Sequence, residues 1–293
     1  MKTFDAAALT GQQKQALLQS VVAPRPICFA STIDSAGEVN LSPFSFFNMF
    51  SIDPPVCVFS PSRRLRDGST KHTLENIRET GEVVINIVNY DMVWQTSLAS
   101  CEYPKGVNEF IKAGFTMLPS ELVKPPRVAE SPVQMECTVR QIIPLDEKPG
   151  SGNLVIADIK RIHVREDLMD AQGRIDPGKL DLVARLGGDW YARITPESLF
   201  EVAKPNVRLG VGMDQLPQLL RETDRLTENE KAELANIESV PLPETGFLDR
   251  YPAIGLVIES GADPSAIIFA EIRAALRNKE IDTAWKLAYF IKR

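Results

Sequence analysis

Short runs of apolar and β-branched residues dominate the first two thirds of the chain. They occupy residues 27–33, 39–50, 56–59, 83–88, 134–143 and 154–164. Turn-forming residues separate several of these runs, as in Asp34-Ser35-Ala36-Gly37 and across residues 147–152. Because apolar runs of this length bounded by turn signals are typical of strands, we predict a β-strand in each.

Helical patterns are fewer and shorter in this part of the chain. We predict a short amphipathic helix in residues 1–20, a second at 74–79 that ends at Gly81, and a third at 92–100. The strands and helices do not alternate regularly, as they would in a doubly wound sheet. The pattern therefore predicts a mainly β fold, an antiparallel barrel with helical excursions.

The pattern changes after about Ile194, where prolines punctuate a sequence with helical periodicity. Thr227-Glu228-Asn229-Glu230 has the form of a capping box, and Asp263-Pro264 places a cap and a first-turn proline before a helix at 266–276. Asp282 is predicted to cap a last helix. We expect a barrel domain at 1–200 and an α-helical extension of unknown role at 201–293.

Composition and charge exclude several classes of protein. The net charge is -6 and the pI about 5.2, which argues against a nucleic-acid-binding protein. No apolar run approaches the ~18 residues of a membrane span, and the N-terminus lacks the apolar segment of a secretory signal. The four cysteines are widely spaced and form no CxxC motif, and with two histidines they predict no metal site. We expect a cytoplasmic protein with reduced thiols.

The densest chemistry lies in residues 40–76. A hydroxyl-rich strand at 42–51 is followed by Asp53-Pro54-Pro55, a second strand, and a basic loop that enters a helix. The hydroxyls and cations of this loop and helix start are Ser60, Ser62, Arg63, Arg64, Arg66, Ser69, Thr70, Lys71 and Thr73. Hydroxyls, cations and helix N-terminal amides suit a phosphate. A solvated basic loop before an ordinary helix start is the alternative, and composition alone favours it.

Together with Pro24-Arg25-Pro26, this order of elements resembles the flavin reductase-like, FMN-binding split-barrel family over about residues 15–200. The resemblance implies an antiparallel split β-barrel and an FMN cofactor. The cofactor-binding residues that it implies are Arg25, Ser42, Ser45, Phe46, Phe47, Asn48, Ser60, Ser62, Arg63, Ser69, Lys71 and Thr73. Backbone groups at 45–48 would bind the ring edge, and the hydroxyls and Lys71 the phosphate. His72 departs from the family pattern, which leaves its role open.

Two arginines and a tyrosine lie outside this stretch. Arg25, fixed between prolines, would face the flavin or a substrate anion, with a surface salt bridge as the equal alternative. The segment from Ala184 to Tyr191 resembles the late active-site loop of the family, in which Arg185 or Tyr191 would cover the flavin or receive a nicotinamide. Since flavin itself accepts hydride, no catalytic acid or base is expected.

The leading hypothesis is an FMN-dependent NAD(P)H oxidoreductase of the flavin reductase type, which passes electrons to a second small-molecule or protein acceptor. The resemblance also implies a homodimer. One alternative is an FMN electron carrier resembling flavoredoxin, served by a protein partner. The other is a barrel without flavin that acts as a scaffold. The sequence leaves the choice between NADH and NADPH open.

Overall fold

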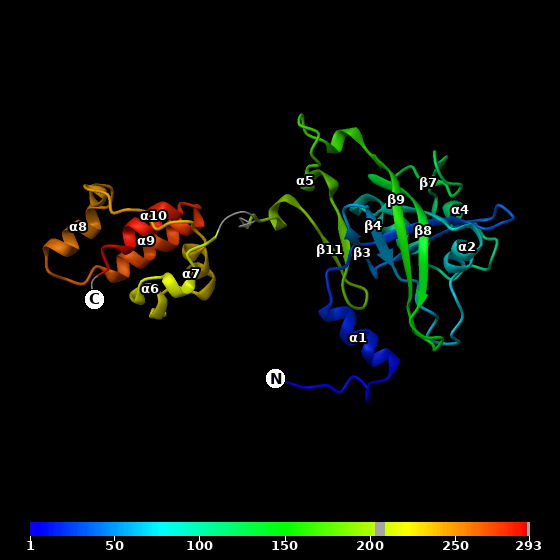
Figure 1. Cartoon of the computed structure of the whole chain (residues 1–293), viewed down its shortest axis with the longest axis horizontal. Helices are drawn as coiled ribbons and strands as arrows, with labels where there is room; N and C mark the ends of the chain where they lie inside the picture. The colour runs from blue at the N-terminus through cyan, green and yellow to red at the C-terminus, as the bar shows by residue number, and fades with distance from the viewer. Residues whose placement is uncertain (203–208, 292–293) are drawn as a thin grey trace. The chain divides into compact units, whose positions relative to one another are not determined.

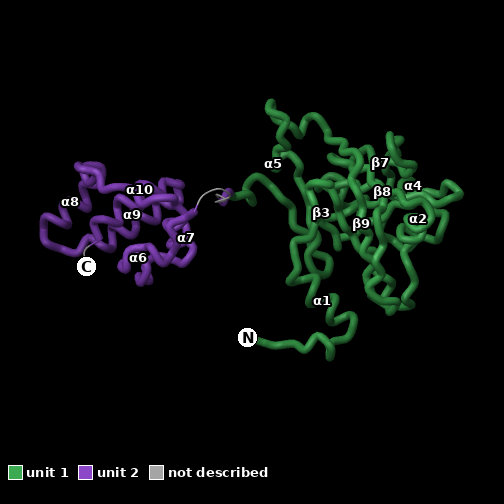
Figure 2. Tube along the Cα trace, viewed as in Figure 1, with its two compact units in different colours: residues 1–200 green, residues 201–293 purple. Residues whose placement is uncertain are grey.

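The computed structural model describes residues 1–202 and 209–291. The chain divides into two compact units, Met1–Phe200 and Glu201–Arg293 (Figure 2). The strands of unit 1 are β1 (Cys28–Ile33), β2 (Val39–Phe44), β3 (Phe47–Ser51), β4 (Val56–Phe59), β5 (Glu82–Ile87), β6 (Met117–Leu118), β7 (Arg127–Val128), β8 (Val133–Pro144), β9 (Asn153–Val164), β10 (Val183–Arg185) and β11 (Tyr191–Arg193). Its helices are α1 (Gly11–Val21), α2 (His72–Thr80), α3 (Val93–Leu98), α4 (Glu109–Ala113) and α5 (Pro177–Leu180).

Seven strands of unit 1 form one antiparallel sheet in the order β2-β1-β5-β8-β9-β4-β3. The long strands β8 and β9 run side by side through its middle (Figure 1). β2 and β3 follow each other in the chain but stand at opposite edges, joined by only Ser45 and Phe46. A flat sheet would hold these edges roughly 29 Å apart, whereas the three Cα steps of the joint span about 11 Å. The sheet must therefore curl, which confirms the predicted antiparallel split barrel.

The prediction of a single strand through residues 39–50, or 42–51, is wrong. The chain leaves one sheet edge after Phe44 and joins the other edge at Phe47, with Ser45 and Phe46 between the two ladders. The apolar pattern continues through the break because both halves pack against the same barrel core. Phe44 is buried there and Phe47 packs against it from the side.

Small and apolar side chains fill the barrel, among them Phe44 and Phe59, whose ring centroids lie 5.6 Å apart. Cys28, Cys57 and Cys137 are free and buried in this core, in keeping with their apolar sequence surroundings, and Cys101 is exposed. A second cluster, with Phe29 and Phe110 fully buried, packs against the outer face of the sheet.

Both of the first two predicted helices are present, but their bounds were predicted with different accuracy. α2 ends as predicted, with Gly81 in the left-handed conformation at a φ of 67°. α1 begins at Gly11, and not at the N-terminus. Its start is fixed by a capping box, in which Thr10 and Gln13 exchange side-chain-to-backbone hydrogen bonds.

The third helix is shorter than predicted. A 3₁₀ turn at Tyr90–Met92 leads into α3, which ends at Leu98. Further 3₁₀ turns of unit 1 lie at Glu166–Leu168 and Pro196–Ser198.

Unit 2 is helical, with α6 (Gln218–Glu222), α7 (Glu228–Ala235), α8 (Pro252–Glu259), α9 (Ser265–Arg277) and α10 (Ile281–Ala288), and 3₁₀ turns at Met213–Gln215 and Phe247–Arg250. Its apolar core surrounds Trp285, whose Nε1 donates to the carbonyl of Leu234 at 2.8 Å. No described helix of either unit is long and apolar enough to cross a membrane.

One of the three caps predicted for unit 2 is present. The capping box of Thr227 and Glu230 is present at the start of α7. The prediction that Asp263 caps α9 with Pro264 in its first turn is wrong, because Pro264 is itself the N-cap residue; Asp263 accepts a hydrogen bond from the N–H of Ser265 at 2.9 Å just before the helix. The prediction that Asp282 caps the last helix is wrong, because α10 already begins at Ile281. Asp282 lies within its first turn and pairs with Lys286 at 2.6 Å.

A buried carboxylate ties the loop before β7 to the sheet. Glu136 of β8 is fully buried and accepts hydrogen bonds from the backbone N–H groups of Glu121, Leu122 and Val123. Nε2 of His163 lies 2.7 Å from its Oε1. Burial acts to raise the pKa of Glu136, but the backbone donors and His163 outweigh it and hold the pKa below its usual value.

We predict that Glu136→Gln lowers the free energy of unfolding at pH 7 by about 1–3 kcal/mol, since charge-assisted hydrogen bonds to a buried group are lost. A depressed pKa stabilises the folded state above the unfolded-state pKa of about 4.3. The difference between wild type and variant should therefore shrink as the pH falls through the folded-state pKa, as measured by urea unfolding at several pH values. Glu121→Gln, which keeps the backbone donor, is the control. An equal effect of both substitutions would refute this account.

Candidate functional site

A cavity of about 540 Å³ lies where the β2–β3 bend, the loop after β4, α1, α3 and the β10–β11 hairpin meet. Its size is within the range of small-molecule sites. Seven residues singled out in the sequence line it: Ser45, Phe46, Ser60, Ser62, Lys71, Arg185 and Tyr191. Segments separated by more than a hundred residues therefore converge on one cavity.

The β2–β3 bend presents unused backbone groups to this cavity. The carbonyl of Phe46 accepts from the N–H of Ser60 at 2.8 Å. Within residues 1–202 and 209–291, no hydrogen bond engages the N–H of Ser45, the N–H of Phe46 or the carbonyl of Ser45. Donors and acceptors alternate along such a backbone, which suits the polar edge of a planar heterocycle.

Three side-chain donors in the cavity are equally unused. The hydroxyls of Ser60 and Ser62 and the ammonium of Lys71 make no hydrogen bond or ion pair with the described part of the protein. Lys71 is half-buried. Burial, and after it the charge of Arg64, lowers the pKa of its ammonium. An anion beside Lys71 would relieve this unfavourable environment.

A small pocket of about 20 Å³ continues the cavity on the side of α2. It shares Lys71 and Ser100 with the main cavity and is lined also by Ser42, Arg64 and His72. Arg64 pairs with Glu102 at 3.0 Å, so its charge is partly neutralised. Glu102 and Glu109 line this pocket as well, so Lys71, which joins it to the main cavity, is the one lining cation there without an ion pair among the described residues.

Arg25 does not line the cavity but supports its wall. It is buried, and its guanidinium donates to the carbonyls of Gln19 (2.6 Å), Val22 (2.7 Å) and Leu186 (2.8 Å) and, more weakly, to Oγ of Ser45 at 3.3 Å. No carboxylate of the described chain pairs with it, so the alternative of a surface salt bridge is wrong. Arg25 instead joins α1, the bend and the β10–β11 hairpin.

Thr73 is fully buried and lines the small pocket together with its network partners Asn40 and Glu109. Its hydroxyl donates to Oδ1 of Asn40 at 2.7 Å, and Nδ2 of Asn40 donates to Oε1 of Glu109 at 2.9 Å. Glu109 also accepts from the N–H of Leu41 at 2.9 Å. Burial raises the pKa of Glu109, and although the hydrogen bonds from Leu41 and Asn40 lower it, the effect of burial is the larger. The network holds the start of α2, and hence Lys71, against β2.

Four further predicted residues lie away from the cavity. Arg63 donates to the carbonyl of Gly68, and the hydroxyl of Ser69 donates to Asp67 at 2.6 Å, so both stabilise the loop itself. Phe47 packs against the barrel core. Asn48 is exposed, and its Oδ1 accepts from the N–H of Met49.

The β10–β11 hairpin approaches α1 closely. A Cβ on Gly187 would lie 2.2 Å from Oγ and 3.2 Å from Cα of Ser20, so only glycine fits there. The guanidinium of Arg185 lies over the ring of Tyr191, 4.4 Å from its centroid. The hairpin backbone at Gly187 therefore packs directly against α1.

Other cavity residues carried no signal in the sequence. Gln15 and Gln19 come from α1, Thr96, Ser97 and Ser100 from α3 and the turn after it, and Asp189 from the hairpin. Isolated polar residues of this kind are common on helix surfaces, so only the fold brings them to one place.

The curled seven-stranded antiparallel sheet and the cavity at its β2–β3 bend define the class, a split barrel. Residues 21–179 match the model of the flavin reductase like domain, and the chain belongs to this family. The resemblance seen in the sequence is thereby confirmed.

Several known proteins are similar to the chain. An uncharacterised protein of Halalkalibacterium halodurans is 36% identical over 188 residues, which are 64% of this chain and 89% of that protein. The structure of nitrilotriacetate monooxygenase component B from Bacillus cereus aligns with a TM-score of 0.64 at 30% identity, covering 69% of this chain and 98% of that one. The 2-nitrobenzoate 2-nitroreductase of Pseudomonas fluorescens aligns with a TM-score of 0.63 at 28% identity, covering 72% and 100%.

We predict that Thr73→Val destabilises the protein by about 1–3 kcal/mol, because Oδ1 of Asn40 loses its donor in a buried setting. Thr73→Ser keeps the hydroxyl and should cost less. Urea unfolding of the three proteins measures both effects. A valine variant as stable as the wild type would show that the network does not hold α2.

Proposed function

We propose that the protein is an FMN-dependent oxidoreductase that accepts hydride from NADH or NADPH and passes the electrons to a second acceptor. The observation that carries this proposal is the set of donors in one cavity that the protein leaves unused: Ser60, Ser62, Lys71 and the backbone of the β2–β3 bend. Membership of the flavin reductase-like family makes a flavin the natural ligand of these groups.

The donor set fits the two ends of FMN. In this proposal the unused backbone groups of Ser45 and Phe46 bind the polar edge of the ring, whereas those of Phe47 and Asn48 belong to the β3–β4 ladder. Lys71, Ser60 and Ser62 bind the phosphate, with Ser42 in the lining of the small pocket. When bound, FMN supplies the hydride-accepting ring.

The remaining predicted residues act indirectly. Arg25 and Thr73 hold the walls through the hydrogen bonds described above, and Arg63 and Ser69 shape the loop between β4 and α2. Arg185 and Tyr191 stay candidates for covering the ring, since both line the cavity. The chain thus binds and orients, and no acid–base pair is assigned.

Two of the similar structures support redox chemistry with a second acceptor. One is named as a monooxygenase component and the other as a nitroreductase. We extend this to the present chain as part of the proposal, together with a cytoplasmic location, in which the cysteines stay reduced.

The absorption spectrum of the purified protein tests this function. FMN is added, the excess removed, and NADH and then NADPH supplied without oxygen. Flavin bands that bleach with either nucleotide are expected. Bands that persist until dithionite is added would replace the proposal with an electron carrier, and a protein that binds no flavin would leave only the scaffold.

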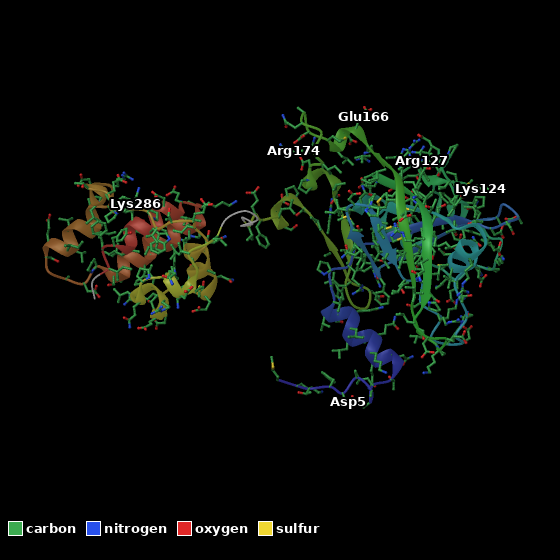
Figure 3. All side chains as sticks on the ribbon, viewed as in Figure 1. Asp5, Lys124, Arg127, Glu166, Arg174 and Lys286 are labelled. Atoms are coloured by element: carbon green, nitrogen blue, oxygen red, sulfur yellow. The ribbon has the colours of Figure 1, made fainter. Side chains whose placement is uncertain are left out.

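We predict that Lys71→Ala weakens FMN binding at least about tenfold, because a charged hydrogen bond to phosphate is lost. Riboflavin, which lacks the phosphate, should bind wild type and variant alike. Fluorescence titration with both flavins measures the contrast. Lys124→Ala, which changes an exposed lysine on the surface of unit 1 (Figure 3), is the control. Equal weakening for both flavins would contradict the assigned role of Lys71.

A homodimer belongs to the same proposal. β3 is an edge strand, and Met49, Phe50 and Ile52 on it and just after it are exposed by 59%, 70% and 80%. Exposed apolar edges favour association. We predict that Phe50→Glu shifts the protein to monomers in analytical ultracentrifugation, while Leu122→Glu, at an exposed apolar residue outside β3, does not. A wild-type monomer, or a dimer that persists in Phe50→Glu, would place any interface elsewhere.

A further inference from the structure

A second cavity of about 450 Å³ adjoins the first, between α3 and the β10–β11 hairpin. We call it the aromatic cleft, since Tyr90, Trp94 and Tyr191 line it. It shares Ser97, Arg185, Asp189 and Tyr191 with the main cavity. A molecule in the aromatic cleft would therefore lie directly beside whatever fills the main cavity.

The aromatic walls of the cleft differ in how they are held. Tyr90 is covered by the guanidinium of Arg193, 3.7 Å from the ring centroid, and Arg193 is fixed by Asp181 through two hydrogen bonds of 2.7 and 2.8 Å. Trp94 is 83% exposed and has no ring or hydrogen-bonding partner for its side chain in the described chain. A tryptophan left so open offers an unused stacking surface.

The charge on the inner wall is positive and uncompensated. Arg185 donates one hydrogen bond, from Nη2 to the carbonyl of Gly188, and forms no ion pair within the described residues. It stands directly across from Arg25, with which it exchanges two backbone hydrogen bonds of 2.9 Å. Nor does any carboxylate within residues 1–202 and 209–291 pair with Arg25. Burial, and after it the charge of Arg185, lowers the pKa of Arg25.

The acidic groups near the cleft do not cancel this charge. Asp181 is already paired with Arg193. Asp189 lines the cleft but is exposed and makes no ion pair with Arg185, so water screens its charge. Two neighbouring guanidiniums without a carboxylate favour an anionic ligand, and Arg185 has N–H groups free to bind a carboxylate through two hydrogen bonds.

We propose that the aromatic cleft binds a planar aromatic carboxylate, with the carboxylate at Arg185 and the ring against Trp94. A neutral aromatic ring would use the stacking surface but leave Arg185 without an anion, and an aliphatic acid would do the reverse. That this ligand is the second substrate of the flavin site rests on the proposed function above. The binding itself does not.

Benzoate and its neutral isostere benzamide are the probes, titrated by calorimetry into the full-length protein without flavin. We expect benzoate to bind at least about tenfold more tightly than benzamide, as a charged hydrogen-bonded pair implies. Arg185→Met should remove this preference, and Asp189→Asn should strengthen it. Trp94→Ala should weaken both probes several-fold.

Matched controls come from the same unit. Trp190→Ala changes a tryptophan that is 77% exposed in the same hairpin but lines neither cavity. Arg174→Met changes an exposed arginine on a different loop (Figure 3). Neither should alter the affinity for benzoate. Equal affinities of the wild type for benzoate and benzamide, or a preference that survives Arg185→Met, would overturn the proposal.

Two further measurements on the same proteins separate the remaining outcomes. A Trp94→Ala variant that changes its sedimentation coefficient but not its benzoate affinity would assign the cleft to a protein interface and overturn the proposal. FMN titration decides the dependence on the proposed function. FMN binding without benzoate binding refutes the cleft alone, whereas benzoate binding without FMN binding refutes the flavin site alone.

Discussion

The two-residue joint between β2 and β3 is the constraint on which the site depends. Because consecutive strands stand at opposite edges of a seven-stranded sheet, the sheet has to close on itself at Ser45 and Phe46. At this point the backbone belongs to neither ladder, and its polar groups lack the partners that strand pairing gives elsewhere. The N–H of Ser60 binds the carbonyl of Phe46 and so brings the loop after β4 to the same place. The bend that closes the barrel therefore also forms part of the cavity wall.

Arg25 stabilises this closure from behind the cavity wall, through hydrogen bonds to α1, the bend and the hairpin. A buried guanidinium without a carboxylate is costly unless its N–H groups are satisfied, and here three carbonyls and a hydroxyl do so. The rigid fork of arginine can reach α1, the bend and the hairpin together, which the single ammonium of lysine cannot do. Its position between two prolines, which the sequence offered as a sign of a binding role, serves this bracing.

Sequence patterns predict the features of this fold that depend on neighbouring residues, namely strands, helix ends and helix caps. The apolar runs identified the strands of the sheet, Gly81 identified the end of α2, and Thr227 with Glu230 identified the start of α7. The break at Ser45 was invisible because both halves of the run face one core. The same limit applies to Thr73, since its partner Asn40 comes from a strand far earlier in the chain.

The same limit applies to the site. The sequence selected Ser60, Ser62 and Lys71, which line the cavity with unused donors, and equally Arg63, Ser69 and Asn48, which the structure engages in the loop or exposes. What separates the two groups is whether the fold has already used the donor. That property depends on distant partners, and no motif records it.

The two cavities share the β10–β11 hairpin as a wall, and this has a consequence for specificity. Gly187 against Ser20 and Arg25 against Leu186 fix this hairpin to α1. A ligand in either cavity would restrain the same hairpin, so occupancy of one cavity should favour the arrangement of Arg185 that the other requires.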